Sequence, residues 1–312
     1  MTYRVLISAP YLLPDVDRFQ DFFKRHHIEA VIADVEERLE ESELLELVGN
    51  IDGVICGDDR FTSRVIDAAP KLKVISKWGT GIDSIDKEAC AAKGIRICRT
   101  PDAFTHPVAD TVLGYILSFA RNLPFMDRDM KDGIWDKIHG RAMNESTVGV
   151  IGVGAIGAAV LRRAKPFEAT LLGADIREID PAVMKETGVE MTTFEDLLAR
   201  SDFVSLNCDL NETSHHLMDS RAFGLMQHHA IVVNAARGPV INEPALVAAL
   251  QSGQIGGAAL DVFEDEPLPT ESPLRAMGNV LIAPHNSNSS RKAWERVHVS
   301  TLKQLVAGLT ET

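Results

Sequence analysis

Three side chains in the C-terminal half of the chain have the types that hydride and proton transfer to a carbonyl would need. They are Arg237, Glu266 and His285, and all three come after a glycine-rich segment at Gly152–Gly157. A guanidinium offers a planar fork of donors to a carboxylate or a polarised carbonyl. A histidine can donate and accept a proton near neutral pH. Each signal is weak alone, but their order along one chain indicates hydride-transfer chemistry.

The glycine segment has the surroundings that a dinucleotide-binding loop requires. A buried strand is predicted at 147–151, and a helix continues through 158–164. Gly152 permits a tight turn, Gly154 lets the backbone approach a pyrophosphate, and Gly157 allows close helix–strand packing. The helix N-terminus faces the phosphate charge. The alternative is a tight turn without a ligand. The predicted cofactor loop contains Gly152, Gly154, Ala155, Ile156 and Gly157.

An acidic residue follows the next predicted strand and indicates which dinucleotide is bound. Asp175 lies 18 positions after Gly157 (175 − 157). A carboxylate there accepts hydrogen bonds from the ribose hydroxyls and would repel a 2′-phosphate. The sequence therefore favours NAD over NADP, although the cation at Arg177 would soften that preference.

Length and charge exclude several functional classes. The chain has 312 residues, enough for two domains, and 45% of them are hydrophobic. Its net charge of −13 gives no electrostatic support for binding nucleic acid or an anionic membrane. A small anionic substrate must therefore be attracted by local basic groups.

The four cysteines form no C-x-x-C pair or zinc spacing, which predicts free thiols in a reducing cytoplasm. No early apolar run reaches the roughly 18 residues of a membrane helix. The N-terminal segment is too short for a signal peptide and is predicted to be a strand. The chemistry requires no metal, and none is predicted.

Alternating strands and helices predict an α/β protein with parallel sheets. A first series ends near Cys98, and a long helix is predicted at 102–121. A second series begins at Thr147, and the chain closes with a helix at 290–308. If that last helix packs on the N-terminal domain, the second series interrupts the first. Strands are predicted at 4–9, 29–35, 53–56, 74–76, 95–98, 147–151, 170–172, 203–206, 231–233, 257–261 and 280–282, and shorter helices at 17–26 and 36–48.

Together these motifs resemble the D-isomer-specific 2-hydroxyacid dehydrogenase family, which includes phosphoglycerate, glycerate and hydroxypyruvate/glyoxylate enzymes. The similarity covers nearly the whole chain and follows the family order. The matching segments are Gly79-Thr-Gly-Ile-Asp83, Val108-Ala-Asp-Thr111, Gly152–Gly157, Asn234-Ala-Ala-Arg-Gly238, Asp261–Pro267 and His285.

This resemblance implies two doubly wound parallel-sheet domains, with substrate held between them. A Rossmann NAD domain at 101–286 would be inserted in a flavodoxin-like substrate domain made of 1–100 and 287–312. The resemblance also implies a cytoplasmic homodimer built through the cofactor domain.

The same resemblance assigns roles to individual residues. His285 would be the acid/base, Glu266 its carboxylate partner, and Arg237 the group that binds substrate and stabilises oxyanion charge. Asp261 would contact the nicotinamide carboxamide. The remaining assignments are Thr111 and Ala235 for the cofactor, and, for the substrate, the amides of Thr80 and Gly81 with Lys77 as a second anion contact.

Some positions depart from the family pattern and leave alternatives open. Asp110 stands where glutamate is usual, and the loop Asn286–Ser290 is unusually polar. Cys56 occupies a position that carries arginine in phosphoglycerate enzymes, although Arg60 is close by. Lys77 and Arg60 would suit a phosphorylated or phosphonate-bearing substrate. A third reading is an NADH-sensing regulatory protein.

Overall fold

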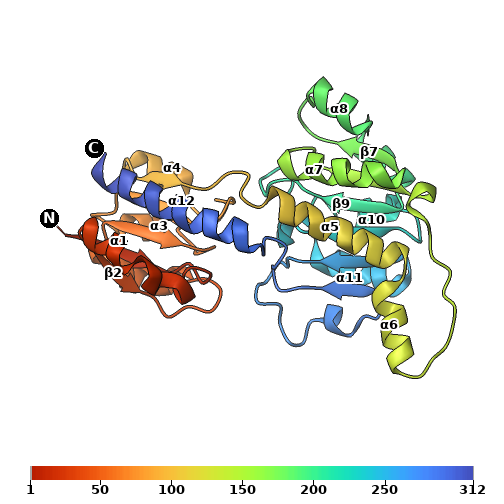
Figure 1. Cartoon of the computed structure of the whole chain (residues 1–312), viewed down its shortest axis with the longest axis horizontal. Coiled ribbons are helices and arrows are strands. Elements are labelled where there is room, and N and C mark those ends of the chain that lie inside the picture. The colour runs from red at the N-terminus through yellow and green to blue at the C-terminus, as the bar shows by residue number, and fades with distance from the viewer. Residues whose placement is uncertain (1, 312) are drawn as a thin grey trace. The chain divides into compact units, whose positions relative to one another are not determined.

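The computed structural model describes residues 2–311, and the chain divides into two compact units (Figure 1). The first unit combines the chain up to Phe104 with the segment that begins at Ser290, and the second unit is Thr105–Ser289. Among the described residues, no helix has both the length and the apolar character needed to cross a membrane.

The first unit is built on a parallel sheet of five strands in the order β2-β1-β3-β4-β5. This is the flavodoxin-like order. Residues in β3 and β4 are buried throughout, as expected for strands covered on both faces. The strands are β1 (Tyr3–Ile7), β2 (Ile28–Ile32), β3 (Gly53–Cys56), β4 (Val74–Lys77) and β5 (Arg96–Cys98).

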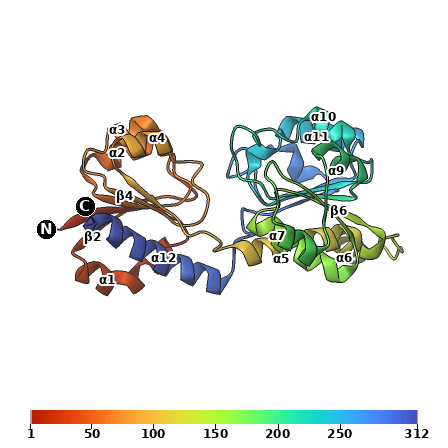
Figure 2. The ribbon, with the colours of Figure 1, turned by 90° about the horizontal axis from the view of Figure 1, so that it is seen from above.

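Helices cover both faces of this sheet. They are η1 (Leu13–Phe19), α1 (Gln20–Arg25), α2 (Glu41–Leu47), η2 (Val48–Asn50), α3 (Ser63–Asp67), α4 (Lys87–Ala92) and α12 (Arg291–Thr310). Figure 2 shows α1 and α12 on one face, with α2, α3 and α4 on the other. The helix predicted at 36–48 begins only at Glu41, because Glu40 forms a capping box with Glu43.

The second unit contains a parallel sheet of seven strands in the order β12-β11-β10-β9-β6-β7-β8. Six of these strands, β8-β7-β6-β9-β10-β11, follow the doubly wound Rossmann order 3-2-1-4-5-6, and β12 is added beside β11. Its strands are β6 (Thr147–Ile151), β7 (Thr170–Ala174), β8 (Glu190–Met191), β9 (Phe203–Leu206), β10 (Ile231–Asn234), β11 (Gly257–Leu260) and β12 (Val280–Ile282). The predicted fold is confirmed, although β8 was not predicted.

The helices of the second unit also lie on both faces of its sheet. They are α5 (Thr105–Ala120), α6 (Leu123–Lys131), η3 (Met143–Glu145), α7 (Ala155–Ala164), η4 (Lys165–Phe167), α8 (Pro181–Thr187), α9 (Phe194–Arg200), α10 (Ser220–Leu225), η5 (Gly238–Val240), α11 (Glu243–Ser252) and η6 (Pro273–Ala276). In Figure 2, α5, α6 and α7 lie on one side, and α9, α10 and α11 on the other. Arg163 of α7 donates to Asp110 of α5 at 2.5 Å, so the unusual Asp110 links two packed helices.

Asp59 ties together the carboxyl ends of two strands and a loop in the first unit. Its side chain is fully buried, and it accepts hydrogen bonds from the Ser8 hydroxyl at 2.5 Å and the Leu39 amide at 2.7 Å. Burial raises the pKa of Asp59 to about 6, against the lowering effect of both hydrogen bonds. Because this pKa lies above the ordinary value of about 4, the folded state binds the proton more tightly than the unfolded chain does.

We therefore expect the free energy of unfolding to fall as pH rises from about 4 to about 6, by roughly 1–3 kcal/mol from this group. Asp59→Asn should remove this part of the pH dependence. Asparagine can still accept from Leu39 and can donate to Ser8, so both contacts survive. Urea unfolding between pH 4 and pH 8 would measure the effect. The exposed Asp67→Asn variant should keep the wild-type slope, and an unchanged slope in Asp59→Asn would refute the explanation.

Candidate active site

Most of the residues predicted for cofactor binding and catalysis follow the strands of the second unit at one edge. All seven strands are parallel, so their carboxyl ends lie along the same side of the sheet. The strand order reverses between β6 and β9, which is where doubly wound sheets bind their ligands. The residues at this edge are Gly152 after β6, Asp175 after β7, Ala235 and Arg237 after β10, Asp261 and Glu266 after β11, and His285 after β12.

Two glycines of the cofactor loop are required by the protein's own packing. Gly152 has φ +84°, and a Cβ there would lie 2.7 Å from the backbone nitrogen of Cys208. A Cβ on Gly157 would overlap the Gly152 carbonyl oxygen. These positions bring the first turn of α7 close to β6, as the sequence predicted.

Gly154 has a different reason to be glycine. Its φ of −77° suits any residue, and the nearest atom to a built Cβ is Nη2 of Arg177 at 3.7 Å. The helix α7 starts here without a side-chain cap and without an acidic residue in its first turn, which contains Ala155 and Ile156. An open glycine at an uncapped helix N-terminus leaves space and backbone donors for a phosphate group. The loop therefore fits the pyrophosphate of a dinucleotide.

Asp175 supports this loop directly. Its side chain is only 4% exposed; Oδ2 accepts from the Val153 amide at 2.8 Å and Oδ1 from the Arg177 amide at 2.9 Å. Nε of Arg177 lies 3.4 Å from the same Oδ1. These three contacts do not use all of the roughly four lone-pair sites of a carboxylate, so Asp175 can still accept from a ribose hydroxyl. Ribose binding by Asp175 stays a prediction. The same holds for Thr111, half-buried on α5, and Ala235, buried just after β10.

Two hydrogen bonds between the Asn234 side chain and the backbone hold the turn that carries Arg237. Asn234 is 1% exposed; its oxygen accepts from the Ala236 amide at 3.1 Å and its nitrogen donates to the Arg237 carbonyl at 2.9 Å. Asn234 belongs to the motif that carries Arg237, but no role was predicted for its side chain. The tendency of asparagine to bond to the backbone two residues on was the available signal.

Gly238 allows the Arg237 turn to pack closely against the segment that leads to Glu266. A Cβ on Gly238 would overlap the carbonyl group of Phe263 and reach within 2.5 Å of the Glu264 nitrogen. Two loops that carry predicted catalytic residues thus meet backbone to backbone. Only a residue without a side chain allows this approach.

Gly238→Ala should therefore lower the free energy of unfolding by about 1–3 kcal/mol, because the methyl group forces the two loops apart. Turnover should fall as well, since Arg237 moves with its neighbour. Urea unfolding and steady-state kinetics would measure both effects. Gly224→Ala is a matched control, since a Cβ on this helical glycine meets nothing within 4 Å and should stabilise the chain slightly. Wild-type stability in Gly238→Ala would contradict the contact.

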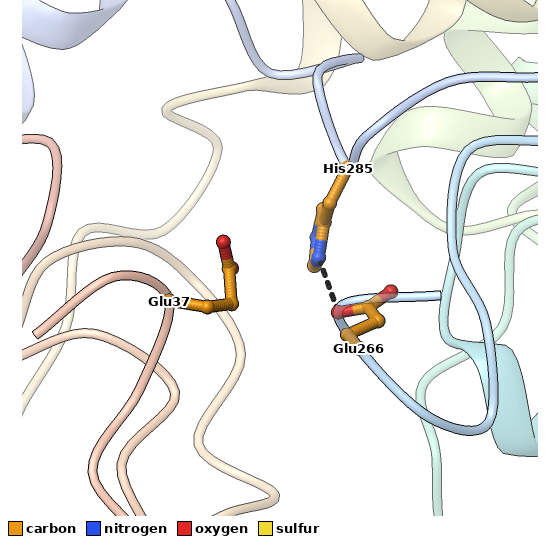
Figure 3. Close-up of side chains that lie close together, drawn as sticks. All are labelled: Glu37, Glu266 and His285. Atoms are coloured by element: carbon orange, nitrogen blue, oxygen red, sulfur yellow. Dashed lines mark hydrogen bonds and ion pairs between the residues drawn. The ribbon is translucent and has the colours of Figure 1, made fainter. Parts of the chain in front are cut away.

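Glu266 and His285 form a close pair (Figure 3). Nδ1 of His285 lies 2.9 Å from Oε2 of Glu266, and the side chains are 18% and 16% exposed. Oε1 of Glu266 accepts from the Phe263 amide at 2.9 Å, so the carboxylate is itself held in place. The structure therefore brings these two predicted residues together. The bond at Nδ1 orients the imidazole and assigns Nε2 to any proton transfer.

Asp261 holds the turn in which His285 lies. His285 has φ +48°, and its amide donates to the Asp261 carbonyl at 2.8 Å. The Asp261 side chain is fully buried and accepts from the amides of Asn286 at 2.8 Å and Ser287 at 2.9 Å. The predicted contact of Asp261 with the nicotinamide stays a prediction. The support that Asp261 gives to the His285 turn was missed.

A second histidine–glutamate pair involves Glu264, two positions before Glu266 in the chain. Nε2 of His216 lies 2.6 Å from Oε1 of Glu264, and its Nδ1 lies 3.3 Å from the Asn242 amide nitrogen. From the sequence, the histidines other than His285 are expected at the surface or in loops. That expectation is wrong for His298, which is 1% exposed on α12, where its Nδ1 accepts from the Trp78 indole at 2.9 Å.

The predicted substrate residues of the first unit follow β4. Gly79 has φ +133°, its carbonyl accepts from the Thr100 amide at 2.8 Å, and the Thr80 hydroxyl donates to the Thr100 carbonyl at 2.9 Å. The amides of Thr80 and Gly81 are the groups predicted to bind substrate. Lys77 is not a solvated lysine: its side chain is 4% exposed, and Nζ lies 3.0 Å from Oδ1 of Asp58.

Comparisons with known proteins agree with this geometry. Residues 113–287 match the family described as D-isomer specific 2-hydroxyacid dehydrogenase, NAD binding domain. A glyoxylate reductase of Thermofilum pendens is 36% identical over 274 residues, which cover 86% of this chain and 81% of that protein. A D-3-phosphoglycerate dehydrogenase of Methanocaldococcus jannaschii is 39% identical over 271 residues, 86% of this chain but 51% of that protein.

Among solved structures, the D-lactate dehydrogenase of Aquifex aeolicus, determined with NAD and lactic acid, has a TM-score of 0.88 and 27% identity. The match covers 97% of this chain and 94% of that one. The family, the NAD cofactor and the dehydrogenase class predicted from the motifs are confirmed. The chain belongs to the D-isomer specific 2-hydroxyacid dehydrogenase family and is an NAD-dependent enzyme.

Proposed function

We propose that this enzyme interconverts a small 2-oxo acid and the corresponding D-2-hydroxy acid, with Arg237, Glu266 and His285 as its catalytic residues. The observation that carries the proposal is the His285–Glu266 pair, held beside the Arg237 turn at the strand edge that also bears the glycine loop. The relatives named glyoxylate reductase and D-lactate dehydrogenase support the same class of substrate.

Each side chain has a defined task in the reduction. A nicotinamide cofactor held at the Gly152–Gly157 loop would supply a hydride to C2 of the oxo acid. His285 donates the proton from Nε2 to the carbonyl oxygen, so the oxo group becomes a hydroxyl. Glu266 holds Nδ1 and keeps the ring oriented. Arg237 donates hydrogen bonds to the substrate and stabilises the negative charge that develops on the oxygen.

We also propose that the other predicted residues have the roles that the family resemblance implies. The unit with the seven-stranded sheet is the NAD domain, in which Gly152–Gly157, Asp175, Thr111, Ala235 and Asp261 serve the cofactor. The unit with the five-stranded sheet is the substrate domain. Within it, the amides of Thr80 and Gly81 bind the substrate carboxylate. The tight turn at Gly79 supports this, because it fixes the backbone of the loop.

A substrate panel tests the proposal. NADH oxidation would be followed at 340 nm with glyoxylate, hydroxypyruvate, pyruvate, 2-oxoglutarate, phosphohydroxypyruvate and phosphonopyruvate. We expect turnover of one or more of the small acids, and loss of that turnover in Arg237→Ala and His285→Ala. Binding of NADH without turnover of any member would contradict the proposal and favour an NADH-sensing role.

We also propose that the enzyme is a cytoplasmic homodimer. Large apolar side chains are exposed along α6 and the segment that follows it, most of all Trp135 at 80%. An exposed apolar strip of this kind is typical of a protein interface. The four cysteines are free thiols, which suits a reducing compartment. Light scattering should give about twice the chain mass of 34.1 kDa, and Trp135→Glu should shift the mass toward one chain.

A further inference from the structure

An ion pair between a buried lysine and a half-buried aspartate lies at the carboxyl edge of the five-stranded sheet. The Lys77 side chain is 4% exposed, that of Asp58 is 32% exposed, and Nζ and Oδ1 lie 3.0 Å apart. Lysine is almost never fully buried unless its ammonium is paired. Asp58 therefore supplies the charge that allows Lys77 to lie where it does. Because Asp58 is the more exposed partner, a ligand approaching the pair meets the carboxylate first.

The pair occupies the place where such a sheet takes its ligand. Lys77 is the last residue of β4 and is in register with Cys56, the last residue of β3, and Asp58 follows two positions later. The strand order reverses between β1 and β3, so the end of β3 borders the topological switch point. In open parallel sheets, ligands bind outside the carboxyl ends at that point. Lys77 also directly precedes Trp78 and the Gly79–Gly81 loop.

The carboxylates of Asp58 and Asp59 make the end of β3 unsuitable for a second anion. The exposed Arg60 guanidinium lies 3.8 Å from Oε2 of Glu40, whose Oε1 also accepts from Arg38 at 2.8 Å. Asp59 lies buried directly beside Asp58 in the chain. A phosphoryl or phosphonate group would thus meet the Asp58 carboxylate, with no unbalanced lysine to receive it. A hydroxyl group can instead donate a hydrogen bond to that carboxylate.

We infer that Asp58 is a specificity-determining residue that selects substrates with an uncharged, hydrogen-bond-donating side chain and rejects those with a second anionic group. This inference rests on the proposed function and decides between the two substrate classes that the sequence left open. Asp58 acts by attraction of one class and by repulsion of the other, and specificity commonly requires both.

Binding, measured separately from turnover, tests this inference. With saturating NADH, D-glycerate and D-3-phosphoglycerate form complexes that cannot react, and calorimetry gives a Kd for each. The wild type should bind D-glycerate at least about tenfold more tightly than D-3-phosphoglycerate. Asp58→Asn keeps the shape of the side chain and leaves the Lys77 charge unbalanced. In this variant, the ratio of the two Kd values should shift toward D-3-phosphoglycerate by about 10- to 100-fold. The double variant Asp58→Asn/Lys77→Gln should lose the gain in D-3-phosphoglycerate binding.

Asp67→Asn is the matched control, because Asp67 pairs with Lys93 at 2.7 Å in the same unit and is 72% exposed. It removes one carboxylate and releases one lysine, so it should keep the wild-type preference. The inference is overturned if the wild type prefers D-3-phosphoglycerate or binds neither acid, or if Asp58→Asn changes the ratio less than threefold. Because the readout is binding, failure of the proposed function appears separately, as absence of turnover in the substrate panel.

Discussion

Replacing His285 with asparagine should lower kcat by about 10²- to 10⁴-fold, the usual contribution of general acid–base catalysis. Asparagine can keep a hydrogen bond to Glu266 but cannot donate a proton from Nε2. NADH binding should change less than about threefold, because the glycine loop lies at the end of a different strand. Steady-state kinetics with the best substrate of the panel, together with fluorescence titration of NADH, would measure both quantities.

His229→Asn is the control for His285→Asn. His229 also pairs with a carboxylate, with Nε2 at 2.6 Å from Oδ1 of Asp202. However, it lies just before β10, at the amino end of the strand, away from the edge that carries His285. This variant should retain most of the wild-type kcat. Should His285→Asn keep more than about a tenth of the activity, another group must donate the proton.

Replacing Arg237 with lysine should lower kcat/KM by about 10²- to 10³-fold, although the positive charge remains. Lysine is a point charge and cannot supply two parallel donors to a carboxylate or an oxyanion. The backbone turn should survive, because Asn234 bonds to main-chain atoms of residues 236 and 237. Kinetics on the same substrate would give the loss.

The exposed Arg221, which pairs with Glu195 at 3.1 Å, provides a matched arginine-to-lysine control that should leave kcat/KM unchanged. Added guanidinium should restore part of the activity of Arg237→Ala, since it replaces the missing fork. Near-normal activity in Arg237→Lys would show that charge alone suffices. In that case, the bidentate role assigned to Arg237 is wrong.

Periodicity and local chemistry predicted the parts of the fold that depend on short stretches of chain. The strands from β6 to β12, except β8, follow from short apolar runs between turn residues. β8 has two residues and is partly exposed, so it left no pattern to detect. The glycine loop was predictable because its glycines stand at the dinucleotide-binding spacing directly between a predicted strand and a predicted helix. Parallel strands then bring Arg237 and His285 to one edge.

The contacts that support the site could not be predicted, because they join residues distant in sequence. Asp261 bonds to amides 25 and 26 positions away, and Trp78 bonds to His298 across 220 positions. Nothing near Lys77 in the sequence indicated that Asp58 would balance its charge. Burial and pairing of this kind are properties of tertiary packing, whereas composition and spacing report only on local structure.

The most direct test of the central claim is to follow a labelled hydride. The enzyme would reduce its best 2-oxo acid other than glyoxylate, whose product has no D and L forms, with NADH carrying deuterium at both positions of nicotinamide C4. The product would be separated on a chiral column and examined by mass spectrometry and NMR. We predict the D-2-hydroxy acid with one deuterium on C2. An L-hydroxy acid, or a product without deuterium at C2, would contradict the assignment of this chain as a D-2-hydroxyacid dehydrogenase acting by direct hydride transfer.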